Sequence, residues 1–149
     1  MKLEEEIHQK NFRNEYQKLA VNLFFTHGWL ANNFSNILKQ FDLTINQFNV
    51  LRILRGQYPN SASVNLLKKR MLDKMSDASR LVERLRAKGY VERSICPHDR
   101  RKVDVVITKA GLEVLDKCDK LELEFDKQLH NLNSTEAKTL NDLLDKLRN

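Results

Sequence analysis

The sequence lacks the features that mark membrane-spanning, secreted and disulfide-rich proteins. No apolar run approaches the ~18 residues that are needed to cross a bilayer. The first ten residues, MKLEEEIHQK, are polar and acidic, unlike a secretory signal peptide. Only two cysteines are present, Cys96 and Cys118, which fits a reducing compartment without a disulfide framework. We therefore expect a cytoplasmic protein that does not interact with membranes.

The sequence also lacks the short motifs by which many enzymes are recognised. It contains no P-loop, GxGxxG, HExxH, CxxC or nucleophile elbow. The histidines are scattered without the spacing of metal ligands; they are His8, His27, His98 and His130. We therefore predict no enzymatic activity, no catalytic residues, no metal site and no cofactor.

What the sequence does contain is a strongly basic region. The chain has a net charge of +6, and residues 64–109 hold 13 Lys or Arg against 6 Asp or Glu, a local balance of +7. The other 103 residues have a balance of −1. A run of charge is most often a solvated face, but its concentration on one third of the chain suits nucleic-acid binding, because phosphate neutralisation dominates that affinity.

A helix followed by a two-stranded hairpin is predicted over residues 73–108. The apolar positions at helical spacing are Ala78, Leu81, Val82 and Leu85. Asp73 is the expected N-cap, and Gly89 stands where a helix ends in the left-handed conformation. Apolar and polar residues then alternate as in strands; the apolar ones are Val91, Ile95, Val103, Val105 and Ile107. Residues 96–102 form the basic hairpin tip.

Helices are predicted on both sides of this region. Residues 4–40 read as one long helix, with a possible bend at Gly28. Thr44 and Gln47 form a capping box, Leu43 and Phe48 a hydrophobic staple, and Gly56 ends that helix. A short helix at 63–71 completes a helix-turn-helix with the helix after Asp73. Beyond the hairpin, a helix capped by Thr108 is followed by a last helix that restarts at residues 133–136. The fold class is therefore mainly α with a small antiparallel β hairpin.

The order of these predicted elements, together with four sequence segments, resembles the MarR family of bacterial transcription regulators. SRLVERLRAKGYVER at 79–93 resembles that family's recognition helix running into the first strand of its wing. PHDRR at 97–101 resembles the wing tip, and ITKAG at 107–111 the start of the helix after the wing. LTINQFNVLRIL at 43–54 resembles the helix that opens the DNA-binding lobe.

The resemblance implies a winged helix-turn-helix protein with dimerisation arms at both ends of the chain. We expect a single domain over residues 1–149, with dimerisation helices at 1–41 and 112–149 and a DNA-binding lobe at 42–111. The implied function is a homodimeric repressor that binds a pseudo-palindromic operator and is released by a small molecule or a redox signal. The alternative is a winged-helix protein-interaction module without specific DNA binding.

Ten residues are candidates for contacts with double-stranded DNA. They are Lys74, Ser76, Asp77, Ser79, Arg80, Arg84, Asp99, Arg100, Arg101 and Lys102. Arg80 is suited to a contact with guanine O6 and N7. Three roles are open for Asp77: it accepts a hydrogen bond from cytosine N4, orients the Arg80 side chain, or caps the helix. Lys74, Arg84, Arg100 and Lys102 suit phosphates.

The resemblance assigns Arg101 to the minor groove, with Asp99 bracing its guanidinium. The plainer interpretation of this pair is an ordinary turn salt bridge. Separately, the plainer interpretation of Arg80 and Arg84 is the solvated face of a helix. Lys68 and Lys69 are expected to be general surface charge.

An effector would bind where the dimerisation arm meets the DNA-binding lobe. The candidates for lining such a cleft are His27, Trp29, Arg52 and Tyr58. Ordinary packing and surface polarity are the commoner explanation for each of them alone. Cys118 lies on an apolar stripe and is expected to be a buried structural thiol, whereas Cys96 at the wing is expected to be exposed and oxidisable. Oxidant-sensing members of the resembled family carry a cysteine near the N-terminal helix; this sequence has none there, which argues against peroxide sensing.

Overall fold

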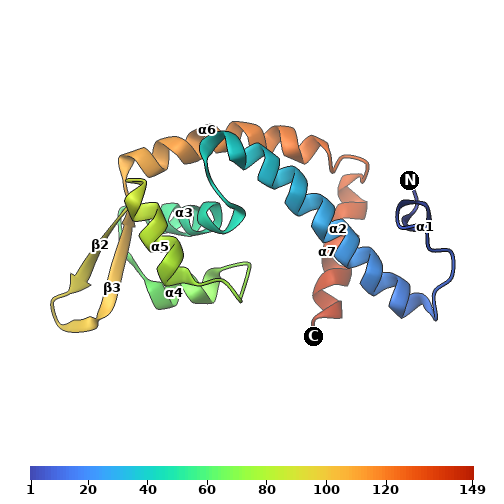
Figure 1. The fold of residues 1–149 in the computed structure, drawn as a ribbon, viewed down its shortest axis with the longest axis horizontal. Helices are drawn as coiled ribbons and strands as arrows, with labels where there is room; N and C mark the ends of the chain where they lie inside the picture. Colours follow the sequence, from blue (N-terminus) through green and yellow to red (C-terminus); the bar gives the residue numbers. More distant parts are fainter.

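A computed structural model describes the backbone of residues 1–149 and every side chain except that of Cys96. In chain order, its elements are α1 (Leu3–Glu6), α2 (Glu15–Leu38), the 3-10 helix η1 (Lys39–Phe41), α3 (Ile45–Gln57), β1 (Ala62–Ser63), α4 (Val64–Arg70), α5 (Ala78–Ala87), β2 (Val91–Cys96), β3 (Asp99–Ile107), α6 (Lys109–Lys127) and α7 (Ser134–Leu147). Helices α3, α4 and α5 and the sheet form a lobe at one end, and α1, α2 and α7 lie at the other (Figure 1). Helix α6 leaves the sheet and runs over the lobe towards that second end. No helix in the described part of the chain is both long and apolar enough to cross a membrane.

The core of the lobe is built from the apolar stripes of its helices. Leu51 of α3, Leu67 of α4 and Leu85 of α5 are fully buried. Leu115 and Cys118 of α6 join the same cluster, so the first half of α6 belongs structurally to the lobe. Burying each leucine contributes ~1.5–3 kcal/mol relative to exposure, and these contacts fix where α5 stands against the sheet.

The sheet has three antiparallel strands in the order β1-β3-β2. Val91 pairs with Ile107 across the hairpin, and Ala62 pairs with Val105 on the other edge of β3. The prediction of a two-stranded hairpin missed β1, because two residues are too few to show an alternating pattern. The predicted seven-residue tip is also wrong, because the strands continue to a turn at Pro97 and His98. Arg100, Arg101 and Lys102 therefore lie within β3.

The predicted capping box of α3 is confirmed. The Thr44 side chain accepts the Gln47 backbone N–H at 3.1 Å, and the Gln47 side chain accepts the Thr44 backbone N–H at the same distance. The staple residues Leu43 and Phe48 are both buried. Helix α3 ends at Gln57, one residue after the predicted Gly56. Gly89 has φ +78°, as the end of α5 requires.

Two predicted helix starts are wrong. The long helix over 4–40 is instead the single turn α1 followed by α2, because the Asn14 side chain accepts the Gln17 N–H at 2.9 Å and caps a new helix there. Gly28 does not interrupt α2. The recognition helix starts at Ala78 rather than after Asp73, because Asp77 is its N-cap. Asp73 closes the preceding turn by accepting the Met75 N–H at 2.9 Å.

Candidate functional site

Helix α5 presents a polar face to solvent because its apolar face is fully used in the core. Ala78, Val82 and Leu85 are buried, whereas Ser79, Arg80 and Arg84 are exposed. The first turn of the helix is therefore free to enter a groove of a nucleic acid. The exposed guanidinium groups provide bidentate hydrogen-bond donors.

Asp77 has a structural explanation within the chain. Its Oδ1 accepts the backbone N–H of Arg80 at 3.1 Å, and a carboxylate at a helix N-terminus also complements the helix dipole. Of the three roles that the sequence left open, the structure shows the cap.

Lys74 and Ser76 lie in the turn before α5 rather than in its first turns. The Ser76 hydroxyl donates to the carbonyl oxygen of Asp73 at 2.7 Å, and the Lys74 ammonium donates to the carbonyl oxygen of Lys69 at 2.5 Å. Both side chains thus brace this turn in the free protein.

The wing places three consecutive basic side chains in solvent: Arg100, Arg101 and Lys102 are all exposed. Asp99 does not brace the Arg101 guanidinium as predicted. Its Oδ1 accepts the backbone N–H of Arg101 at 3.0 Å, because a side chain two positions earlier reaches the local backbone more easily. The carboxylate therefore shapes the strand entry and leaves the guanidinium unpaired within the described side chains.

A cleft of about 220 Å³ joins the wing to the helix-turn-helix. It is lined by Ser63, Val64, Asn65, Lys68, Ser79, Arg101, Lys102 and Val103. Three predicted residues, Ser79, Arg101 and Lys102, thus meet in one place. Asn65 was not predicted as a site residue and Lys68 was expected to be general surface charge, yet both line this cleft. The sequence has no local signal for this, because β3 comes beside α4 only in the fold.

The charges of this face are divided between internal ion pairs and free cations. Glu83 of α5 pairs with Arg86 at 3.2 Å and also with Arg93 of β2. Arg80 and Arg84 have no such carboxylate among the described side chains. Arg80 and Arg84, which were predicted to contact DNA, are therefore unpaired cations, and they face solvent where a polyanion can neutralise them.

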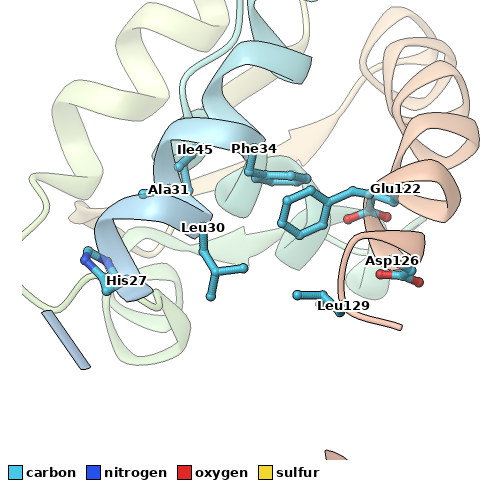
Figure 2. A pocket seen from close by; sticks show the side chains of 9 residues that line it. His27, Leu30, Ala31, Phe34, Ile45, Glu122, Asp126 and Leu129 are labelled. Atoms are coloured by element: carbon cyan, nitrogen blue, oxygen red, sulfur yellow. The ribbon is translucent and has the colours of Figure 1, made fainter. Parts of the chain in front are cut away.

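A second site lies between α2, α3 and α6. A pocket of about 390 Å³ is lined by His27, Leu30, Ala31, Phe34, Ile45, Glu122, Phe125, Asp126 and Leu129 (Figure 2). Of the four predicted effector residues, only His27 lines it. Trp29 lies at a different hollow beside α1, and Tyr58 is about half exposed at the end of α3. The ring centroids of Phe34 and Phe125 are 5.2 Å apart.

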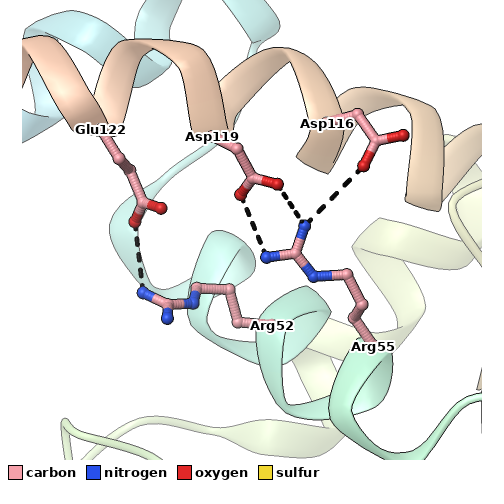
Figure 3. A network of polar contacts seen from close by, with 5 residues as sticks. All are labelled: Arg52, Arg55, Asp116, Asp119 and Glu122. Atoms are coloured by element: carbon pink, nitrogen blue, oxygen red, sulfur yellow. Dashed lines mark hydrogen bonds and ion pairs between the residues drawn. The ribbon is translucent and has the colours of Figure 1, made fainter.

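Beside this pocket, ion pairs connect α3 to α6 (Figure 3). Arg55 donates to both carboxylate oxygens of Asp119, at 2.8 and 3.0 Å, and lies 4.0 Å from Asp116. Arg52, the fourth predicted effector residue, donates to Glu122 at 3.2 Å. Burial raises the pKa of Glu122 above its usual value, against the opposing effect of Arg52. Glu122 thus belongs both to the pocket and to the ion pairs that hold α3 against α6.

Cys118 is buried as predicted, with 1% of its surface exposed. Removal from water raises the pKa of its thiol to about 11, and the nearby Asp119 carboxylate adds to the shift. The prediction for Cys96 falls on a side chain outside the described ones. Within the described residues, no group of three or more His, Cys, Asp or Glu is arranged to hold a metal ion.

Comparison with known proteins finds the same family in sequence and in structure. The sequence model of the MarR family matches residues 41–102. The multiple antibiotic resistance protein MarR of Salmonella typhimurium is 32% identical over 118 residues, which cover 76% of this chain and 78% of that protein. The transcriptional repressor IacR of Pseudomonas putida is 27% identical over 120 residues, which cover 80% of this chain and 71% of that protein.

Two solved structures resemble the whole molecule. A MarR-like transcription regulator from Bacillus cereus superposes with a TM-score of 0.80 at 26% identity, covering 90% of this chain and 96% of that one. A mutant of Escherichia coli MarR in complex with operator DNA superposes with a TM-score of 0.78 at 28% identity, covering 93% of this chain and 99% of that one. The similarity therefore extends over the helices at both ends as well as the lobe.

Proposed function

The chain belongs to the MarR family of transcription regulators, and on that premise we propose that it is a repressor that binds a pseudo-palindromic operator as a homodimer and is released by a small molecule. The observation that carries this proposal is the cleft shared by α4, α5 and the wing. There, Ser79, Arg101 and Lys102 meet beside Lys68, in the arrangement that a duplex needs from a recognition helix and a wing.

The recognition helix supplies the sequence-reading contacts. Arg80 is exposed on the first turn of α5 and is suited to a bidentate contact with guanine in the major groove. Ser79 stands beside it, and Arg84 is one turn further along, where a phosphate is the nearer partner. Asp77 supports this geometry as the N-cap, and Lys74 and Ser76 extend the contact through the preceding turn.

The wing supplies the second contact. Arg101 has no ion-pair partner in the described part of the chain, and its cationic side chain suits the narrow minor groove of A·T-rich DNA. Arg100 and Lys102 flank it for phosphates, while Asp99 holds the backbone of the strand.

The helical ends supply the dimer interface. Large apolar side chains on these helices and on the turn between α6 and α7 remain exposed in the single chain: Tyr16, Leu19, Phe24, Phe25, Trp29, Leu123, Leu129, Leu132, Leu140, Leu143 and Leu147. An apolar surface of this extent is typical of a protein interface, and a second copy would cover it with two-fold symmetry. Residues 1–41 and 112–149 serve dimerisation on this proposal, and 42–111 bind DNA, although the first turns of α6 also pack in the lobe.

Release by an effector would act through the pocket between α2, α3 and α6. A ligand there changes the angle between the arms and the lobe, so that the two recognition helices no longer fit successive major grooves. The buried Cys118 thiol, with its raised pKa, makes a small molecule the better candidate than an oxidant acting at that residue.

Fluorescence anisotropy with an operator selected from random DNA tests the DNA contacts. We expect Arg80→Ala to cost ~1–3 kcal/mol of binding and to relax the preference at one base position. We expect Arg101→Ala to weaken binding and to reduce discrimination of A·T-rich flanks. The matched control is Arg86→Ala on the same helix, whose guanidinium pairs with Glu83; it should bind as wild type.

Wild-type operator affinity in both variants would show that the site assignment is wrong. Failure of the wild-type protein to bind any DNA at low salt would overturn the proposal itself and favour the alternative, a winged-helix module that binds another protein.

A further inference from the structure

The pocket between α2, α3 and α6 has walls suited to one small aromatic molecule. Its volume of about 390 Å³ lies within the range of ~300–1,000 Å³ that is typical of small-molecule sites. Phe34 and Phe125 form one wall with their rings tilted at 55°, and Leu30, Ala31 and Ile45 extend the apolar lining. A flat apolar molecule would replace water here with favourable contacts.

The charged groups of the same pocket have one sign. Glu122 and Asp126 both line it from α6, and no lysine or arginine does; His27 lines it from α2. Arg52 reaches Glu122 from α3 at 3.2 Å but is not among the lining residues. An anionic ligand would therefore face two carboxylates without a cation to bind it, whereas a cationic ligand would find complementary charge and two aromatic faces.

We propose that this pocket binds a small aromatic cation, and that Glu122 transmits the binding to the DNA-binding lobe because it exchanges Arg52 for the ligand. This inference rests on the proposed function, in which the pocket is the effector site, and it names the charge class of the effector. Asp126 is exposed, and among the described side chains it forms no ion pair, so it provides a second carboxylate that is free for the ligand.

The ion pairs beside the pocket explain how such a ligand would act. Arg52–Glu122 and Arg55–Asp119 are consecutive links between α3 and α6 (Figure 3). The first link shares its carboxylate with the pocket, whereas the second does not. A ligand cation that engages Glu122 weakens the first link and leaves the second in place. The second half of α6, which leads to the dimerisation arm, can then shift relative to the lobe while the first half stays packed in the core.

The partial burial of Glu122 also favours a cationic ligand. Its carboxylate is partly withdrawn from water, which disfavours its charge and raises its pKa, and its one ion-pair partner is the half-exposed Arg52. A cation placed on the pocket side would offset that cost, so Glu122 gains more from a ligand of positive charge than a solvated carboxylate would.

Three probes with one ring system test the charge class directly. They are 1-naphthylmethylammonium, 1-naphthalenemethanol and 1-naphthoate, and calorimetry without DNA measures their binding to the wild-type protein. We expect the cation to bind at least tenfold more tightly than the alcohol, and the anion to bind most weakly. Equal or tighter binding of the naphthoate, or no measurable binding of the cation, would overturn the proposal.

Variants then test the role of Glu122. Glu122→Gln should weaken cation binding at least tenfold, whereas Glu124→Gln, a control that pairs with Lys127 one turn along the same helix, should leave it unchanged. Arg52→Gln should strengthen cation binding, because Glu122 is no longer shared; a purely structural role of the ion pair would weaken it. If Arg52→Gln and Glu122→Gln change the affinity in the same direction, Glu122 does not link the two sites.

Operator binding separates this inference from the proposed function. If the protein binds its operator but prefers the anionic probe, the proposed function stands and the charge class is wrong. If it binds the cation but no DNA, the proposed function fails while the pocket assignment stands. If saturating cation leaves operator affinity unchanged, the transmission through Glu122 is wrong.

Discussion

Replacing Gly111 by alanine should destabilise the protein, although the same change inside a helix is usually favourable. Gly111 is in the first turn of α6, where its N–H donates to the Thr108 hydroxyl at 3.2 Å. A Cβ there would lie 2.4 Å from the carbonyl oxygen of Tyr90 and 2.7 Å from Cγ1 of Ile107. The Tyr90 oxygen cannot move freely, because it accepts the Thr108 backbone N–H at 3.0 Å.

The magnitude follows from two opposing effects. Alanine is favoured over glycine in a helix by ~1 kcal/mol, whereas overpacking a tight site costs ~1–3 kcal/mol and occasionally more. Because one colliding atom belongs to a fixed backbone, the cost should be at the upper end, and the net loss should be about 2 kcal/mol. For a chain of this size, that lowers the melting temperature by about 4–8 °C.

Urea unfolding followed by circular dichroism at one protein concentration measures this loss. Gly56→Ala is the matched control, because Gly56 is also helical and a Cβ there would meet nothing within 4 Å; it should be stabilising by up to ~1 kcal/mol. If Gly111→Ala proved as stable as the wild type or more so, the tight junction between the wing and α6 would be refuted.

Two further measurements, one on Asp77 variants and one on the Cys118 thiol, have expected outcomes. Asp77→Ala should cost ~1 kcal/mol in urea unfolding because α5 loses its N-cap, while Asp77→Ser should keep most of the stability; equal losses in both would contradict the capping role. The Cys118 thiol should resist iodoacetamide at pH 8 in the folded protein and react once urea unfolds it, because burial raises its pKa to about 11. Peptide mass spectrometry separates it from Cys96, and rapid labelling of Cys118 in the folded protein would count against its burial.

The features that the sequence predicted well depend on neighbouring residues. Thr44 and Gln47 are three positions apart and satisfy each other's backbone, so their types alone specify the start of α3. Gly89 marks a left-handed position for the same local reason. The start of α2 was missed because Ile7 and Phe12 continue the apolar pattern, although the cap at Asn14 begins a new helix.

The features that the sequence did not predict depend on contacts between distant segments. Phe34 and Phe125 come together only because α2 and α6 cross at the lobe, and neither position has a local signal for a pocket. Arg52 was named as an effector residue, yet its carboxylate partner is 70 positions away and only the fold reveals it. Lys68 likewise joins Arg101 only when β3 folds beside α4.

Operator affinity as a function of half-site separation tests most directly whether two basic lobes are held at a fixed spacing on DNA. Half-sites selected from random DNA would be separated further by inserting 5 or 10 bp, that is, about half a turn or one turn of the helix. We predict that the 5 bp insertion reduces affinity to that of a single half-site, because it moves the second major groove to the opposite face of the duplex. Unchanged affinity for the 5 bp insertion would contradict the proposal that a dimer reads both half-sites with its paired recognition helices.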